Sequence, residues 1–123
     1  MGVENNEVVI ATTWNDKFIE SAKEFINTVP DIFKKLFVII PSIANGKNTV
    51  ILGPDGSKKG WKTAEKGEEL RELFIEFLES NLYEDSSNCW QWVEVGYGEF
   101  GQKVLRGNCH NLYDNNDYCC RVE

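Results

Sequence analysis

The chain has 123 residues, of which 41% are hydrophobic and 27% charged, and 20 acidic against 13 basic residues give a net charge of -7. This composition is typical of one globular domain with its own core and excludes a two-domain enzyme. The longest apolar run, residues 36–40, is far shorter than the roughly 20 residues of a membrane span, and the first residues lack a secretory core. We therefore expect a cytoplasmic protein without membrane contact, whose acidic surface disfavours nonspecific nucleic-acid binding.

The first third of the chain predicts a strand followed by a helix. Residues 7–13 are rich in β-branched side chains, which favour a strand. Apolar residues between positions 18 and 29 recur at steps of three and four, which predicts an amphipathic helix that begins near Asp16 and ends at Pro30. Residues 31–35 add a short helical turn.

A hairpin is predicted next. The apolar run 36–40 is typical of a central strand that is covered on both faces. Asn45 and Gly46 both tolerate positive φ, so they predict a type I′ turn that joins residues 37–44 to residues 48–52. The first strand, the helix and the second strand could form one parallel crossover.

The second half predicts a helix and a second hairpin. The helix follows from a buried stripe at steps of three and four, made of Leu70, Leu73, Phe74, Phe77 and Leu78. Alternation over residues 90–95 predicts a strand that a glycine-rich loop connects to residues 102–106. The fold class is therefore α+β: a two-layer sandwich with a mostly antiparallel sheet of four to five strands and two helices on one face, in the order β-α-β-β-α-β-β. Residues 1–107 form the single domain, and residues 108–123 are expected to be an irregular tail packed on it.

The predicted second helix carries a row of carboxylates opposite its apolar stripe. We call this row the glutamate stripe, and it consists of Glu65, Glu69, Glu72, Glu76 and Glu79. At 1.5 Å per residue it extends over about 21 Å, long enough to meet a basic surface. The simpler interpretation is a charged face kept for solubility, which Lys62 and Arg71 partly neutralise.

Aromatic residues are numerous, with four Trp, four Tyr and seven Phe. Trp90, Trp92, Tyr97 and Phe100 gather in the second hairpin and are candidate interface anchors. Trp90 and Trp92 share one face of the strand, so the alternative is that both pack under the helices.

Two segments suggest ligand chemistry only weakly. Cys109, His110, Cys119 and Cys120 offer zinc-type ligands, but their spacing does not match that of structural zinc sites. Residues 56–63 contain glycines, lysines and a threonine before a helix, which suggests an anion site, although the spacing departs from that of a nucleotide loop.

No local spacing proposes a nucleophile with its base or a carboxylate pair, so catalysis is not the favoured interpretation. The sequence favours a small acidic, non-enzymatic protein-binding domain of the inhibitor, immunity or adaptor type that engages a basic partner without a cofactor. The alternatives are a metal- or redox-responsive protein that uses the Cys/His cluster, with zinc as its metal, and a small α+β enzyme.

Overall fold

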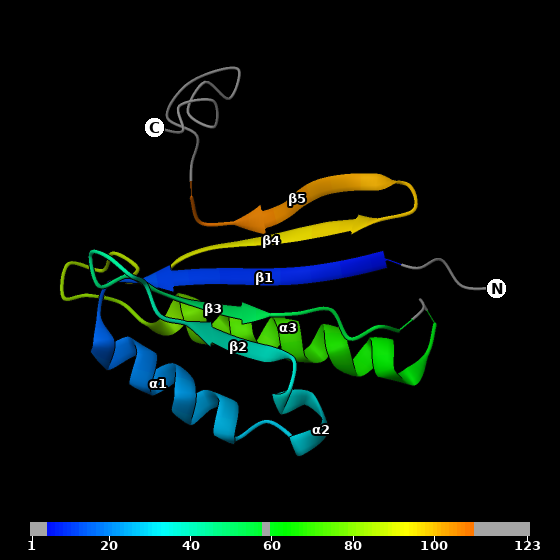
Figure 1. The fold of residues 1–123 in the computed structure, drawn as a ribbon, viewed down its shortest axis with the longest axis horizontal. Helices are drawn as coiled ribbons and strands as arrows, with labels where there is room; N and C mark the ends of the chain where they lie inside the picture. The colour runs from blue at the N-terminus through cyan, green and yellow to red at the C-terminus, as the bar shows by residue number, and fades with distance from the viewer. Residues whose placement is uncertain (1–4, 58–59, 110–123) are drawn as a thin grey trace.

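The computed structural model describes residues 5–57 and 60–109, and Figure 1 shows its elements. In chain order they are β1 (Asn5–Thr13), α1 (Asp16–Asn27), α2 (Asp31–Lys34), β2 (Phe37–Ile40), β3 (Asn48–Leu52), α3 (Lys62–Ser80), β4 (Gln91–Gly98) and β5 (Gly101–Gly107). The predicted order of strand, helix, hairpin, helix and hairpin is confirmed. All but the first two residues of the predicted tail lie outside the described residues.

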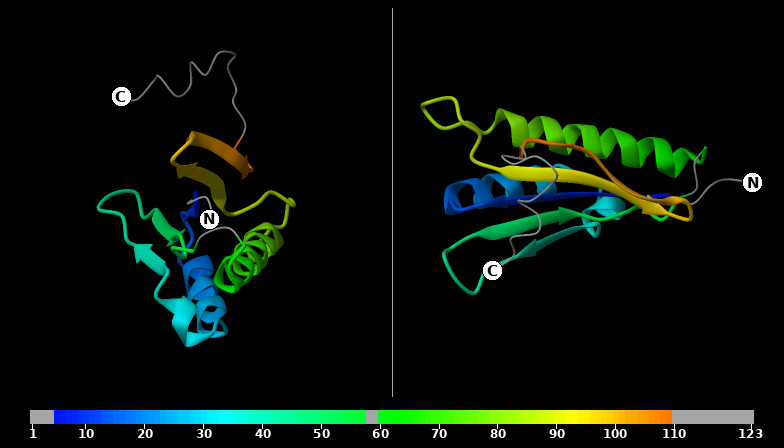
Figure 2. Two further views of the ribbon diagram at one scale, coloured as in Figure 1. Left: turned by 90° about the vertical axis from the view of Figure 1, so that its right-hand side faces the viewer. Right: turned by 90° about the horizontal axis from the view of Figure 1, so that it is seen from above.

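The five strands form one antiparallel sheet in the order β2-β3-β1-β4-β5. β1 and β2 run parallel to each other, but β3 lies between them, so the predicted crossover is a split β-α-β unit. α1 and α3 lie together on one face of the sheet (Figure 2). The fold is therefore the two-layer α+β sandwich that the sequence predicts.

The core lies between the sheet and the two long helices. Val9 and Ala11 of β1 point into it and are fully buried. Phe25 of α1 stacks on Phe77 of α3 with 5.0 Å between ring centroids, and such contacts between aromatic rings add to the burial of apolar area. α1 begins where the sequence predicts, because the Asn15 side chain accepts a hydrogen bond from the backbone N–H of Lys17 at 2.9 Å.

The apolar run 36–40 was wrongly predicted to be a central strand. β2 lies at the edge of the sheet, because β3 returns on its inner side and takes the place next to β1. Phe37 of β2 is buried, whereas Val38 and Ile40 on the other face are 51% and 45% exposed. The run is apolar on both faces although helices cover only one of them.

The first hairpin has a longer loop than the sequence predicts. β2 ends at Ile40 and β3 begins at Asn48, so residues 41–47 form the connection. Asn45 and Gly46 both have φ of 64°, the positive value expected of a type I′ pair. The positive φ of both residues was predicted correctly, but the strand before them ends at Ile40 and not at residue 44 as predicted.

Candidate functional site

The outer side of α3 carries the exposed carboxylates. All five residues of the glutamate stripe are exposed, and Glu68 is exposed beside them. The buried side of the helix consists of Gly67, Leu70, Arg71, Phe74, Ile75 and Leu78. Leu73 was predicted to be on the buried side and is instead 54% exposed, because the helix turns the row of Gly67, Arg71 and Ile75 toward the sheet.

Within the described residues, the glutamate stripe forms one ion pair. Arg106 of β5 reaches across to α3, where its Nη2 donates a hydrogen bond to Glu72 Oε1 at 2.5 Å. This bond lowers the pKa of Glu72 below its usual value. Glu79 accepts a hydrogen bond from Asn88 Nδ2 at 2.6 Å and is not neutralised by it. The other four carboxylates of the stripe therefore have no cationic partner among the described residues.

Arg71 does not neutralise the outer face of α3, contrary to the sequence prediction. Its side chain is 9% exposed and points toward the sheet, where it meets three carboxylates. Its Nε lies 3.2 Å from Glu7 Oε2 and 3.8 Å from Glu94 Oε2, and its Nη1 lies 3.6 Å from Asp55 Oδ2. A buried cation among carboxylates satisfies the rule that buried charges are paired.

Glu94 connects this buried cluster to the surface. Its side chain is 3% exposed, and its Oε1 accepts a hydrogen bond from Arg106 Nε at 2.6 Å. Hydrogen bonds to Glu72 and Glu94 raise the pKa of the Arg106 guanidinium, so it stays charged. Arg106 therefore bridges a buried carboxylate and an exposed one, and fixes β5 against α3.

Gly67 makes room for the carboxylate of Asp55. A Cβ atom at position 67 would stand 1.8 Å from Asp55 Oδ2, so no larger residue fits while Asp55 keeps its place. Asp55 is held there by the backbone N–H of Ser57, which donates to Oδ1 at 2.8 Å, and by Arg71. A glycine inside a helix is unfavourable by itself, so its presence reflects this close approach.

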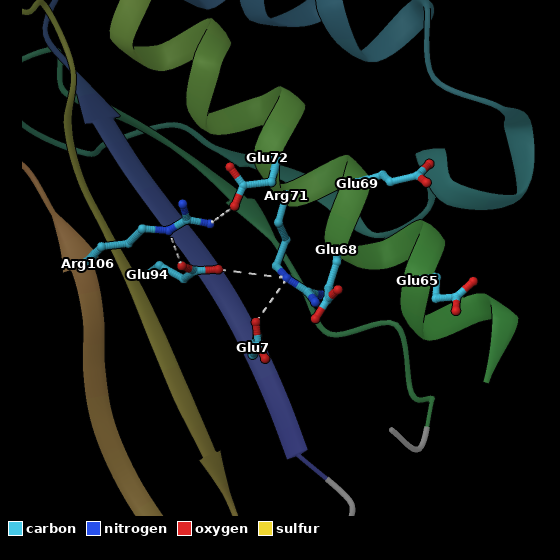
Figure 3. Close-up of a pocket in the computed structure, with 8 residues that line it drawn as sticks. All are labelled: Glu7, Glu65, Glu68, Glu69, Arg71, Glu72, Glu94 and Arg106. Carbon is cyan, nitrogen blue, oxygen red and sulfur yellow. Dashed lines mark hydrogen bonds and ion pairs between the residues drawn. The ribbon is translucent and has the colours of Figure 1, made fainter. Parts of the chain in front are cut away.

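A hollow of about 560 Å³ lies between α3 and the sheet (Figure 3). Its lining consists of Glu7, Glu65, Glu68, Glu69, Arg71, Glu72, Glu94 and Arg106, so six glutamates and two arginines give a net charge of -4 when all are ionised. Both arginines are already bound to carboxylates of the hollow. The lining includes neither a hydroxyl or thiol nucleophile nor an imidazole, so its chemistry suits the binding of a cationic group.

The aromatic candidates are not brought together with the glutamate stripe. Trp90 and Trp92 are only 1% and 4% exposed, so their placement as interface anchors is wrong and they belong to the core under the helices. Tyr97 and Phe100 are 44% and 84% exposed at the tip of the second hairpin. Tyr97 follows Gly96 of the buried face and therefore points to the opposite face of the sheet from α3.

The predicted zinc ligands are mostly outside the described residues. Cys109 is described and exposed, whereas His110, Cys119 and Cys120 are not described. Cys89 is buried, and burial raises the pKa of its thiol to about 11, which makes it a poor ligand and a poor nucleophile. Within residues 5–57 and 60–109, no group of three or more His, Cys, Asp or Glu side chains is arranged to hold a metal ion.

The anion site predicted over residues 56–63 is described only in part, because residues 58–59 are outside the described ranges. One backbone donor of this loop is already used, since the N–H of Ser57 binds the Asp55 carboxylate. An internal carboxylate therefore occupies the place beside Ser57 where an anion would bind.

No model of a known protein family matches the chain, and no curated protein or solved structure matches it either. Among the helices of the described residues, none combines the length and the apolar composition needed to cross a membrane.

Proposed function

We propose that this chain is a small acidic, non-enzymatic protein-binding domain of the inhibitor, immunity or adaptor type, which engages a basic partner surface in the cytoplasm. The observation that carries the proposal is the exposed glutamate stripe, of which only Glu72 has a cationic partner among the described residues. Unpaired carboxylates along one helix face create a negative field that attracts basic surfaces and speeds their association.

The hollow beside the stripe adds a more specific feature. Its carboxylates come from β1, β4 and α3, so both the sheet and the helix line it, and Figure 3 shows those of Glu7, Glu94 and Glu72 beside the two arginines. Arg71 and Arg106 hold Glu7, Glu94 and Glu72 in fixed positions, so these acceptors are ordered before a partner arrives. A lysine or arginine side chain of the partner is the natural occupant of such a space.

An exposed apolar residue borders the glutamate stripe. Leu73 is 54% exposed and stands one helical turn from both Glu69 and Glu76. An exposed leucine beside a row of carboxylates offers an apolar contact next to the charged ones, as protein interfaces combine apolar and polar contacts.

The test compares two variants with the same loss of charge. The stripe variant carries Glu65→Gln, Glu69→Gln and Glu76→Gln, which keep the shape and leave the ion pair of Glu72 intact. The control variant carries Glu20→Gln, Glu24→Gln and Glu99→Gln, which are exposed positions away from α3. Both variants and the original chain are used to capture proteins from extract of the source cells, and captured proteins are quantified by mass spectrometry.

We expect a basic protein that the original chain and the control variant retain and the stripe variant loses. With that protein purified, the stripe variant should associate about tenfold more slowly at low salt, and its rate should depend less on salt concentration. Equal capture and equal association rates for the two variants would show that the glutamate stripe is not the binding surface.

A further inference from the structure

The face of the sheet opposite the helices is apolar. In the left view of Figure 2, α1 and α3 lie on one side of the sheet, and no described element covers the other side. The register places apolar side chains opposite each other across neighbouring strands of this open face. Val38 pairs with Ile51, Ile51 with Ile10 and Ile10 with Val93, and a second row pairs Val95 with Val104.

This open face also lacks charge. The side chains alternate between the two faces along β1 to β4, whereas in β5 a bulge between Val104, which pairs with Val95, and Arg106, which pairs with Glu94, interrupts the alternation. The register therefore assigns each strand residue that is paired to one of the two faces. Every charged residue of the five strands belongs to the helix-covered face, namely Glu7, Glu94, Lys103 and Arg106. The polar residues of the open face include Thr12, Thr49, Gln91 and Gln102, all of them neutral.

A face without charge is unusual for a sheet that water covers, since polar and charged residues normally alternate with the buried ones on that side. Val38 and Val104, on the two edge strands, are 51% and 66% exposed. The open face thus has the composition of a buried surface in a chain whose net charge is -7.

We propose that the open face is a dimer interface, on which a second copy of this chain packs sheet against sheet. A basic partner finds no carboxylate on this face, and an acidic partner finds no cation. Two copies of an acidic chain repel each other, so they associate most readily through a surface that carries no charge. Rows of β-branched side chains on a regular sheet are self-complementary, as a two-fold interface requires, and two such sheets pack about 10 Å apart.

The size of the open face is adequate for this role. Five strands at about 4.8 Å spacing, with a mean length of about 20 Å, give a projected area of about 480 Å² per copy. Two copies together therefore cover about 1,000 Å², which reaches the lower limit for a specific interface before the relief of the side chains is counted.

The test is the mass of the full chain in solution, measured by sedimentation equilibrium over a dilution series from about 100 μM. We expect a species of twice the 14.1 kDa chain mass that dissociates on dilution. Val38→Lys with Val104→Lys places cations on the open face at positions that are already exposed, and should weaken the dimer at least tenfold. The control is Ile32→Lys with Ile43→Lys, at exposed apolar positions of α2 and of the loop before β3, which should leave the dimer unchanged.

A second variant distinguishes loss of the dimer from misfolding. Gln91→Glu with Gln102→Glu adds like charges to the open face without altering its shape, and should weaken the dimer in a manner that added salt partly reverses. A chain that is monomeric at about 100 μM overturns the proposal and leaves another part of this chain or a different protein as the cover. A dimer that survives both sets of substitutions overturns it as well, and indicates pairing through the edges β2 or β5.

Discussion

Gly67 provides the sharpest test of the buried charge cluster. Replacing a glycine inside a helix by alanine normally stabilises a protein by up to about 1 kcal/mol, because the unfolded chain loses conformational freedom. Here the new methyl group would stand 1.8 Å from Asp55 Oδ2, so the carboxylate must shift away from the positions in which Ser57 and Arg71 hold it. We therefore predict that Gly67→Ala destabilises the chain.

The magnitude follows from what Asp55 gives up. It loses its hydrogen bond from Ser57, worth about 1 kcal/mol, and its contact with the buried Arg71. Removing one partner of a buried charge pair costs about 3 to 5 kcal/mol, but Arg71 keeps Glu7 and Glu94, so we expect about 2 kcal/mol from this term. Against the gain in helix propensity, the net loss for Gly67→Ala is about 2 kcal/mol.

The decisive measurement is a double-mutant cycle by urea denaturation, with the slope of each transition compared to confirm two-state unfolding. In a chain that carries Asp55→Ala the obstacle is absent, so Gly67→Ala should now stabilise by about 1 kcal/mol. The effect of Gly67→Ala on the free energy of unfolding should thus change sign when Asp55 is replaced by alanine. A loss of equal size in both backgrounds would refute the steric argument, and so would a gain in the original chain.

The remaining predictions concern Arg106, its partner Glu72, and Cys89. Arg106→Ala should destabilise the chain by about 2 kcal/mol at neutral pH, because the buried Glu94 carboxylate then has only Arg71, at 3.8 Å, as a cationic partner. A change in the free energy of unfolding below about 0.5 kcal/mol, measured by urea denaturation, would contradict the bridging role of Arg106. The hydrogen bond from Arg106 also lowers the pKa of Glu72 below its ordinary 4.5, so this contribution to stability is present above pH 4.5 and is lost on acidification. The difference in the free energy of unfolding between the Arg106→Ala variant and the original chain should therefore narrow below pH 4.5. The Cys89 thiol, whose pKa burial raises from 9.0 to about 11, stabilises the folded state below pH 9 and loses that contribution between pH 9 and 11. In a chain that carries Cys119→Ser and Cys120→Ser, the exposed Cys109 thiol should react quickly with an alkylating reagent at pH 8, and the buried Cys89 thiol only on unfolding. Equal reaction rates would show that Cys89 is accessible.

The elements were predictable because each depends on a local pattern. The apolar stripes of α1 and α3 and the alternation of β4 are periodicities that can be recognised within the short segment that forms each element. The neighbours of each strand depend on contacts that are distant in sequence, which is why the edge position of β2 was missed. An apolar run does not reveal whether both of its faces are covered, and for β2 one of them is not.

The charge cluster was missed although a signal for it exists. Glu94 lies in the same phase of the alternating pattern as Trp92 of β4 and Trp90 just before it, so burying the two tryptophans requires burying the glutamate as well. A buried glutamate needs a cation, and Arg71 lies in the buried phase of α3, one turn from Phe74. The residues could thus have been singled out from their phase, but their pairing with Glu7, Asp55 and Arg106 needs the tertiary structure.

The two proposed surfaces are compatible because the sandwich separates them. The glutamate stripe lies on α3, on the side of the sheet that the helices cover, whereas the open face is the other side of the sheet (Figure 2). A dimer joined through the open faces would therefore carry its two glutamate stripes on opposite outer surfaces, both free to bind. Because every charged strand residue faces the helices, like charges are kept away from the contact between copies while the negative field remains on the surface that meets the partner. Two stripes on one particle allow two partner copies to be held at once, or a partner with two basic sites to be bound more tightly than one stripe alone would bind it.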